Sequence, residues 1–207
     1  MYCPPAFREN REDVLIEAIE AHPLATLITH GEEGLKANVV PVTVMQGADG
    51  PVIRFHLAKA NDQIGDLRAG RAVLLQFHGP HAYVSPNWYP TKQRDGKAVP
   101  TWDYIIVQAS GVPAVHPDPE WLRKQLTALT DRHEGGRETP WTLGDAPPDY
   151  VAAQLKGIVG VEVVVEKIEG KWKLNQNHPM ENRLGLADGL AADGEPVLAA
   201  AVRATIG

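Results

Sequence analysis

Residues able to bind a phosphate group follow one expected strand in the first third of the chain. The segment RFHLAKAND, residues 54–62, places His56 near the end of the strand and Lys59 and Asn61 on the connection after it. A lysine and a histidine at one strand end hold a phosphate through charge-assisted hydrogen bonds. Strand alternation puts Arg54 and His56 on the same face. Taken alone, these residues are better explained as a solvated polar face that binds no ligand.

The segment 78–104 concentrates aromatic side chains on a backbone rich in turns and proline. It contains Tyr83, Trp88, Tyr89, Trp102 and Tyr104. Flat rings on loops that a rigid scaffold supports are suited to form the walls of a site for a planar ligand. The alternative is that they pack one end of a barrel or a dimer contact, where tyrosine and tryptophan are enriched.

A third cluster of polar side chains lies within residues 169–185. Its amides and cations are Lys171, Lys173, Asn175, Gln176, Asn177 and Arg183. They suit hydrogen bonding to the polar edge of a ligand or between two subunits. The exposed strand of a hairpin followed by a helix explains the same pattern.

Other chemistries have weak support. His78 and His81 flank Gly79 and Pro80, but no third ligand with a recognised spacing accompanies them, so no metal site is expected. Cys3 is the single cysteine and has no evident activating partner. No serine lies in a Gly-x-Ser-x-Gly nucleophile motif. The residues therefore favour ligand binding over a defined catalytic group.

Composition limits the class of protein. The chain has 207 residues and a formal net charge of −6, so no global basic field attracts nucleic acid or acidic lipid. One cysteine excludes a disulfide framework within the chain and favours a reducing, cytoplasmic setting. No leader pattern and no apolar segment long enough to span a membrane is expected.

Hydrophobic periodicity predicts a mainly β chain with helical additions. Strands are expected at 24–29, 35–45, 52–57, 72–77, 82–84, 101–115, 158–168 and 172–177. A turn at 46–50 joins the second and third of these into a hairpin. Helices are expected at 10–22, 119–135 and 147–156, and in a tail from 179 that is broken at Gly185, Gly189 and Gly194. Strands and helices do not alternate, which favours a small antiparallel barrel.

Together these segments resemble the PaiB family of FMN-binding negative transcriptional regulators. The likeness runs nearly end to end through the strings MYCPPAF, HPLATLIT, FHLAKAND, FHGPHAYVSPNWYPTK, VPTWDY, LTDRHE, IVGVEV and GKWKLNQN. The resemblance implies one α+β domain over residues 1–207, a six-stranded antiparallel split β-barrel of the FMN-binding type. A helical insertion occupies about 118–157 and a helical C-terminal tail about 179–207. It also implies a homodimer with FMN in a cleft between subunits.

The resemblance also assigns residues to FMN. His56, Lys59 and Asn61 match the position of the flavin phosphate. The neighbouring strand residues are expected beside the ribityl chain or ring, and the aromatic loop and late hairpin are expected to add residues, some from the second subunit. The strand residues are Lys36, Asn38 and Val39. The residues of the aromatic loop and late hairpin are Lys92, Thr101, Trp102 and Gln176.

Two departures from the family pattern bear on flavin affinity. Similar sequences commonly have arginine, alanine, asparagine and proline where this chain has Lys59, Ala60, Asn61 and Asp62. The cation is kept, but the bidentate guanidinium and the proline are lost. Asn175 stands where serine is common.

The resemblance implies an FMN-binding homodimer with a regulatory output. Direct DNA contact is doubtful, because no helix-turn-helix pattern or basic recognition helix accompanies the net charge of −6. The alternative is a flavoenzyme related to flavin reductases or pyridoxamine-phosphate oxidases, with His78, His81 and Tyr83 the first residues to substitute. A haem-binding barrel with His78 or His178 as axial ligand is less favoured.

Overall fold

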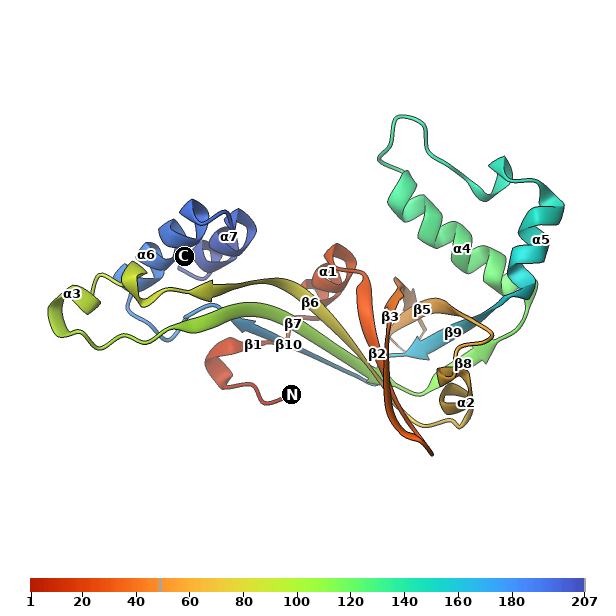
Figure 1. Ribbon diagram of the computed structural model, residues 1–207, viewed down its shortest axis with the longest axis horizontal. Helices are drawn as coiled ribbons and strands as arrows, with labels where there is room; N and C mark the ends of the chain where they lie inside the picture. Colours follow the sequence, from red (N-terminus) through yellow and green to blue (C-terminus); the bar gives the residue numbers. More distant parts are fainter. Residues whose placement is uncertain (49, 207) are drawn as a thin grey trace. The chain divides into compact units, whose positions relative to one another are not determined.

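The fold consists of antiparallel sheets with seven helices in the described residues, which confirms the predicted α+β class (Figure 1). The computed structural model describes residues 1–48 and 50–206. Its strands are β1 (Arg8–Glu9), β2 (Leu24–Gly31), β3 (Gly34–Pro41), β4 (Thr43–Gly47), β5 (Gly50–Ala58), β6 (Val73–Val84), β7 (Thr101–Gly111), β8 (Pro113–His116), β9 (Ile158–Val164) and β10 (Lys167–Lys173).

The helices are α1 (Glu12–Ala21), α2 (Gln63–Arg68), α3 (Lys92–Asp95), α4 (Pro119–Glu134), α5 (Pro148–Lys156), α6 (Met180–Ala192) and α7 (Pro196–Ala204). Three short 3-10 helices, η1 (Pro5–Phe7), η2 (Pro86–Trp88) and η3 (Leu143–Asp145), lie between them. None of the described helices is long and apolar enough to cross a membrane.

The chain forms two compact units, each built from separate segments. Unit 1 comprises Met1–Ala18, His78–Val107 and Glu169–Gly207, and unit 2 comprises Ile19–Phe77 and Gln108–Ile168. Strands β6 and β7 contribute to both units. The prediction of a single domain therefore stays a prediction.

Unit 2 contains two antiparallel sheets. In one sheet β7, β6, β2 and β3 are successive neighbours, and in the other the order is β4, β5, β9 and β8. Both sheets supply fully buried side chains, among them Leu27, Phe77, Phe55 and Val161. Helices α4 and α5 pack together through Leu122, Val151 and Leu155, as expected for an amphipathic insertion.

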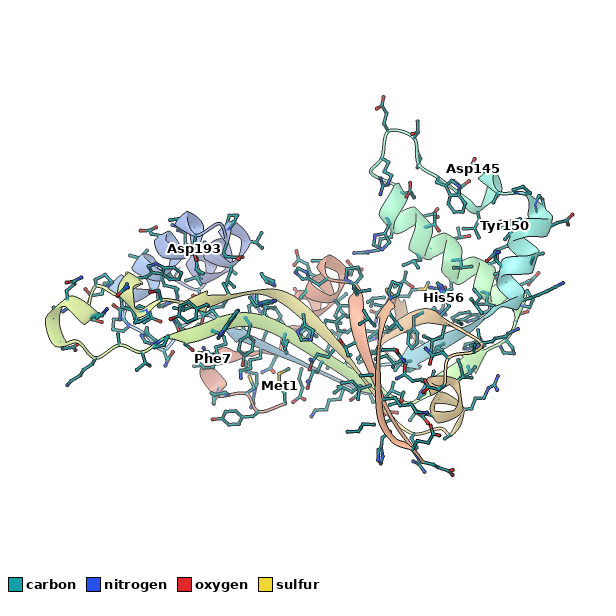
Figure 2. All side chains as sticks on the ribbon, viewed as in Figure 1. Met1, Phe7, His56, Asp145, Tyr150 and Asp193 are labelled. Carbon is teal, nitrogen blue, oxygen red and sulfur yellow. The ribbon has the colours of Figure 1, made fainter. Side chains whose placement is uncertain are left out.

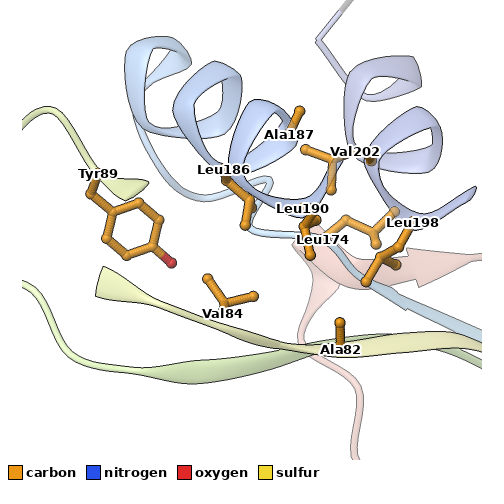
Figure 3. Close-up of a cluster of buried hydrophobic side chains, with 10 residues drawn as sticks. Ala82, Val84, Tyr89, Leu174, Leu186, Ala187, Leu190, Leu198 and Val202 are labelled. Atoms are coloured by element: carbon orange, nitrogen blue, oxygen red, sulfur yellow. The ribbon is translucent and has the colours of Figure 1, made fainter. Parts of the chain in front are cut away.

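Unit 1 contains β1, most of β10, residues 78–84 of β6 and residues 101–107 of β7. Helices α6 and α7 pack on these strands (Figure 3). Its core cluster consists of Ala82, Val84, Tyr89, Leu174, Leu186, Ala187, Leu190, Leu198, Ala199 and Val202. The predicted helical tail is therefore the cover of this core.

Several strand predictions were wrong in their boundaries. The expected strand at 101–115 is two strands, β7 and β8, which lie in different sheets, and the expected strand at 158–168 ends at Val164. The expected strand at 35–45 is two strands in different sheets, and the chain changes sheet at Val42, whose amide donates to the Pro23 carbonyl at 2.9 Å. Pro41 cannot donate to a ladder, so it suits the end of β3. The expected strands at 72–77 and 82–84 are one strand, β6. The predicted hairpin of β4 and β5 is confirmed by its register, although Asp49 of its turn lies outside the described residues.

The C-terminal predictions also needed correction. Helix α6 runs through Gly185 and Gly189 without a break. A Cβ at Gly189 would lie 2.3 Å from Trp88 Cδ2, so this glycine admits the indole and does not end the helix. The strand expected at 172–177 ends with Lys173. Asn175 then has a φ of 56°, a left-handed conformation that no strand residue adopts.

Candidate functional site

A fully buried carboxamide, that of Gln63, joins three segments of unit 2. Its Nε2 lies 3.2 Å from the Leu27 carbonyl and 3.3 Å from the Lys36 carbonyl, so the amide bridges β2 and β3 from the start of α2. Its Oε1 accepts a hydrogen bond from Asn38 Nδ2 at 2.9 Å. The Gln63 backbone amide donates to Asn61 Oδ1 at 2.8 Å. The structure thus brings two predicted residues, Asn38 and Asn61, onto one polar network.

Lys36 lies on the same strand and is already held by carboxylates. Its Nζ is 2.8 Å from Glu33 Oε2 and 3.4 Å from Asp62 Oδ2. The hydrogen bond with Glu33 raises the pKa of Lys36, and the charge of Asp62 adds to the effect. Asp62 is the residue at which the resemblance leads us to expect a proline. The charge that this lysine offers a ligand is therefore partly neutralised.

A pocket of about 350 Å³ opens beside these residues. Its lining includes the cations Lys36 and Arg71 and four carboxylates, Glu32, Glu33, Asp62 and Asp66. Asp66 accepts a hydrogen bond from Thr29 Oγ1 at 2.8 Å. A Cβ at Gly31 would lie 1.8 Å from Asp66 Oδ1, so a side chain at this position would displace the carboxylate. The lining has more negative than positive groups.

Lys59 and Val39 are the exposed side chains among the predicted FMN residues of unit 2. Lys59 is exposed on the connection between β5 and α2, and its backbone amide donates to the Gly157 carbonyl at 2.9 Å. Its ammonium has no carboxylate partner among the described residues. Val39 is 61 % exposed on β3. Lys59 therefore offers a cation two residues before Asn61 in the chain, whereas Val39 faces away from Asn38 on β3.

His56 has a different environment from Lys59. Its Nδ1 lies 3.0 Å from Gln125 Oε1 of α4, and burial lowers its pKa, against a smaller opposing effect of this hydrogen bond (Figure 2). Arg54 pairs with Glu162 at 2.6 Å. Arg54 and His56 are partly exposed while Phe55 and Leu57 are buried, which confirms the predicted alternation. A neutral imidazole directed at α4 is poorly suited to hold a phosphate, and the described contacts do not join it to Lys59 or Asn61.

The other predicted ligands lie in unit 1. Lys92 Nζ donates to Asn87 Oδ1, and Thr101 Oγ1 accepts from Lys173 Nζ at 2.7 Å. Gln176 uses its carboxamide within its own turn, accepting from the Leu174 amide at 2.9 Å. Trp102 is 53 % exposed. A role in FMN binding for these four residues stays a prediction.

The rings of segment 78–104 do gather in part. Trp102 lies 5.9 Å from His81 and 6.4 Å from Tyr83 between ring centroids. Tyr89 is instead buried in the unit 1 core. The aromatic residues of this segment therefore lie partly in the core of unit 1 and partly on its surface.

Sequence reasoning missed Gln63 and Asp66. Both lie on α2, a six-residue helix that was not predicted because it is too short to show a helical apolar period. The available signal was Asn61, whose type favours an Asx turn that starts such a helix. In the described residues no group of three or more metal-ligating side chains is found.

Comparison with known sequences connects this geometry to a protein family. A family model described as "Putative FMN-binding domain" matches residues 1–167. "Protease synthase and sporulation protein PAI 2" of Bacillus subtilis is 29 % identical and covers 95 % of this chain and 92 % of its own. An uncharacterized protein of Emericella nidulans is 30 % identical over 98 % of this chain and 96 % of its own.

Solved structures share the fold. A conserved hypothetical protein from Mycobacterium tuberculosis has a TM-score of 0.62 at 16 % identity and covers 86 % of this chain and 94 % of its own. An FAD and heme binding protein from Mycobacterium smegmatis has a TM-score of 0.58 at 15 % identity and covers 80 % of this chain and 73 % of its own. At these identities the likeness concerns the split-barrel architecture alone.

The Gln63 network is expected to stabilise unit 2 measurably. Gln63→Ala leaves the Leu27 and Lys36 carbonyls and the Asn38 amide without this partner, and each buried unsatisfied group costs about 1–3 kcal/mol. We expect urea denaturation to show a loss of about 2–4 kcal/mol. Gln93→Ala, on an exposed position of α3, is the control and should change stability by less than about 0.5 kcal/mol. Equal effects of the two substitutions would contradict the role of this amide.

Proposed function

Because the chain belongs to the PaiB family of FMN-binding domains, we propose that it holds FMN in unit 2, where β3 meets the connection between β5 and α2. The observation that carries this proposal is the network in which Gln63 joins Asn38 of β3 to Asn61 of that connection. Amides fixed in this way present donors and acceptors to a polar ligand without first having to be ordered.

The residues present fit the chemical parts of FMN. The phosphate requires a cation, which Lys59 supplies. Asn61 follows two residues later in the chain. The ribityl hydroxyls and the polar edge of the ring require amides, supplied by Asn38 and Asn61. Val39 lies on the face of β3 opposite to Asn38, so its role as apolar cover for the ring stays a prediction. When bound, FMN provides electron-transfer chemistry, and the chain provides binding, orientation and electrostatics.

One electrostatic feature opposes tight binding. FMN carries a dianionic phosphate, whereas the neighbouring pocket has four carboxylates to two cations. Asp62 lies 3.4 Å from Lys36 and reduces the positive potential there. The same position was singled out from the sequence as a departure from the family. We infer that this chain binds FMN more weakly than relatives with an uncharged residue at that position.

We further propose that two copies associate through the exposed face of β2 and β3. Cross-strand pairs put Leu24 opposite Pro41 and Thr26 opposite Val39, and residues two apart share a face. On this face Leu24 is 60 % exposed and Leu35 is 76 % exposed. β3 is also an edge strand in the described sheet. Exposed apolar side chains on an edge strand favour association, and a second copy supplies a matching apolar face.

The family's regulatory role is proposed to be indirect in this chain. α4, the longest described helix, carries three basic and three acidic residues, and α6 carries one basic and two acidic residues. A DNA recognition helix needs a basic surface, and the chain as a whole has a net charge of −6. The output therefore passes through a partner protein or a small molecule.

The FMN site is tested by substitution of the two charges that act on it in opposite directions. Lys59→Met should raise the FMN dissociation constant about ten- to hundredfold, because a hydrogen bond to a charged group contributes about 1.5–3 kcal/mol. Asp62→Asn should lower it about two- to fivefold by freeing Lys36. FMN fluorescence titration measures both. Lys124→Met and Asp131→Asn, exposed on α4, are matched controls that should bind as the unaltered chain does.

The dimer is tested by placing a charge on the proposed interface. Val39→Glu should convert the protein to a monomer in sedimentation velocity, since burying an unpaired carboxylate opposes association. Val197→Glu, at a 65 % exposed valine of α7, should stay dimeric. A monomeric unaltered protein, or equal effects of the two substitutions, would contradict the interface.

The indirect route is tested with the purified, FMN-saturated protein. We expect no salt-sensitive, sequence-specific binding to promoter DNA in a gel-shift assay, because α4 and α6 carry no excess of basic residues. Specific operator binding at nanomolar concentration would overturn this part of the proposal.

A further inference from the structure

Unit 1 contains a second pocket, of about 330 Å³, that the proposed FMN site does not use. Its polar lining comes from three stretches of chain and includes Tyr89, Lys97, Thr101, Lys173 and His178. Among the described residues that line it, none has a carboxylate. Two lysines without a lining acid give the pocket a positive character, opposite to that of the pocket in unit 2. Cavities of this volume accept small organic ligands.

The ammonium of Lys173 is fixed at the pocket wall. Its Nζ donates to Thr101 Oγ1 at 2.7 Å and to the Trp102 carbonyl, and lies 3.5 Å from Asp103 Oδ1. The Asp103 side chain has no exposed surface, and neither of its oxygens accepts a hydrogen bond from a described residue. A buried carboxylate is costly unless it is paired, so Asp103 and Lys173 depend on each other. Lys173 thus lies between a buried acid and the pocket.

An amide and a phenol add neutral donors to this wall. Asn175 has the left-handed φ of 56°, and its Nδ2 donates to Tyr89 Oη at 2.6 Å. The Tyr89 hydroxyl keeps its own hydrogen for a further acceptor. The His178 ring stacks on Tyr89 with 5.1 Å between centroids. Phe7, labelled in Figure 2, also lines the pocket and provides an apolar surface.

We propose that this pocket binds a small organic oxyanion other than FMN, a carboxylate or a phosphate monoester with an apolar or aromatic body. Lys97 and Lys173 supply the charge, and Thr101, Tyr89 and Asn175 lie where hydroxyl and amide groups orient the anion. The apolar part of the ligand lies against Phe7 and the paired rings of Tyr89 and His178. The proposal goes beyond FMN binding, since every residue that carries it belongs to unit 1.

The buried acid makes this site sensitive to pH. Burial raises the pKa of Asp103 to about 6, against the opposing charge of Lys173. Above that pH the carboxylate offsets Lys173, and below it Asp103 is neutral and the full charge of Lys173 acts on the pocket. Burial and then the charge of Lys173 lower the pKa of His178, so this ring gains a proton only in more acidic solution. Burial also raises the pKa of Tyr89, which stays protonated throughout. Anion affinity should therefore rise as pH falls through about 6.

Calorimetric titration of the full chain with benzoate and with phenyl phosphate tests the site. The two probes share one ring and differ only in the anion, so their relative affinities identify the preferred headgroup. At least one should bind with a stoichiometry of one per chain. Benzoate, whose carboxylate stays ionised, should bind about three- to tenfold more tightly at about pH 5.5 than at about pH 7.5.

Two variants and a control assign that binding to the pocket. Asp103→Asn should tighten benzoate binding at neutral pH about three- to tenfold and remove most of the pH dependence, since Lys173 is then no longer offset. Lys97→Met, at an exposed position, should weaken binding at least about threefold. Lys124→Met on α4 should have no effect. Failure of both probes to bind, or binding that neither variant changes, would overturn the proposal.

A competition experiment separates this site from the FMN site. Benzoate binding that persists at saturating FMN supports an independent pocket in unit 1. Displacement of benzoate by one equivalent of FMN would place the flavin phosphate here and overturn the proposal. Benzoate binding in a chain that fails to bind FMN would contradict the proposed function and leave this inference intact.

Discussion

The buried carboxamide of Gln63 is the constraint on which the arrangement of unit 2 depends. It has no exposed surface, and its hydrogen bonds reach β2, β3 and the connection that precedes its own helix. A buried amide that lost these partners would carry an unsatisfied polar group, so the three segments are fixed relative to one another. Asn38 and Asn61 owe their positions to this network. The need to satisfy one buried amide thus places the two residues of the candidate ligand site.

The charges of their linings distinguish the two pockets more than their volumes do. Their volumes are similar, about 350 and 330 Å³, but the first has four carboxylates in its lining and the second has none among the described residues. In unit 2 the cations near the proposed phosphate position are exposed or already paired, whereas in unit 1 Lys173 is backed by a buried acid. The proposed anionic ligands would therefore be controlled differently in the two units. Surface carboxylates would compete with the ligand in unit 2, and the ionisation of Asp103 would set its affinity in unit 1.

Periodicity and local motifs predicted much of the fold. The alternation of Arg54 and Phe55 on β5 follows from the two-residue repeat of a strand, and Asp118 followed by Pro119 marks the start of α4, where Asp118 Oδ2 accepts from the Trp121 amide at 2.8 Å. Contacts between distant segments were not predictable in this way. Whether Gly189 ends a helix or admits Trp88 depends on where the indole lies, and only the folded chain determines that.

The candidate site shows the same limit. The lysine and asparagine after β5 were identified from residue type, and the family resemblance added Asn38. Gln63 was missed because a single buried polar residue on a short helix leaves no periodic signal. The pairing of His56 with Gln125 of α4 could not be foreseen either, since 69 positions separate them in the sequence. Asp62 was noticed only as a departure from a pattern, and its ion pair with Lys36 gives that departure its physical meaning.

A crystal structure of the chain grown with FMN tests the central claim most directly, because it locates the phosphate. The account predicts the phosphate at Lys59 and Asn61 in unit 2, with the polar part of the flavin against the Asn38 amide. A phosphate held by Lys97 and Lys173 in unit 1 would contradict it.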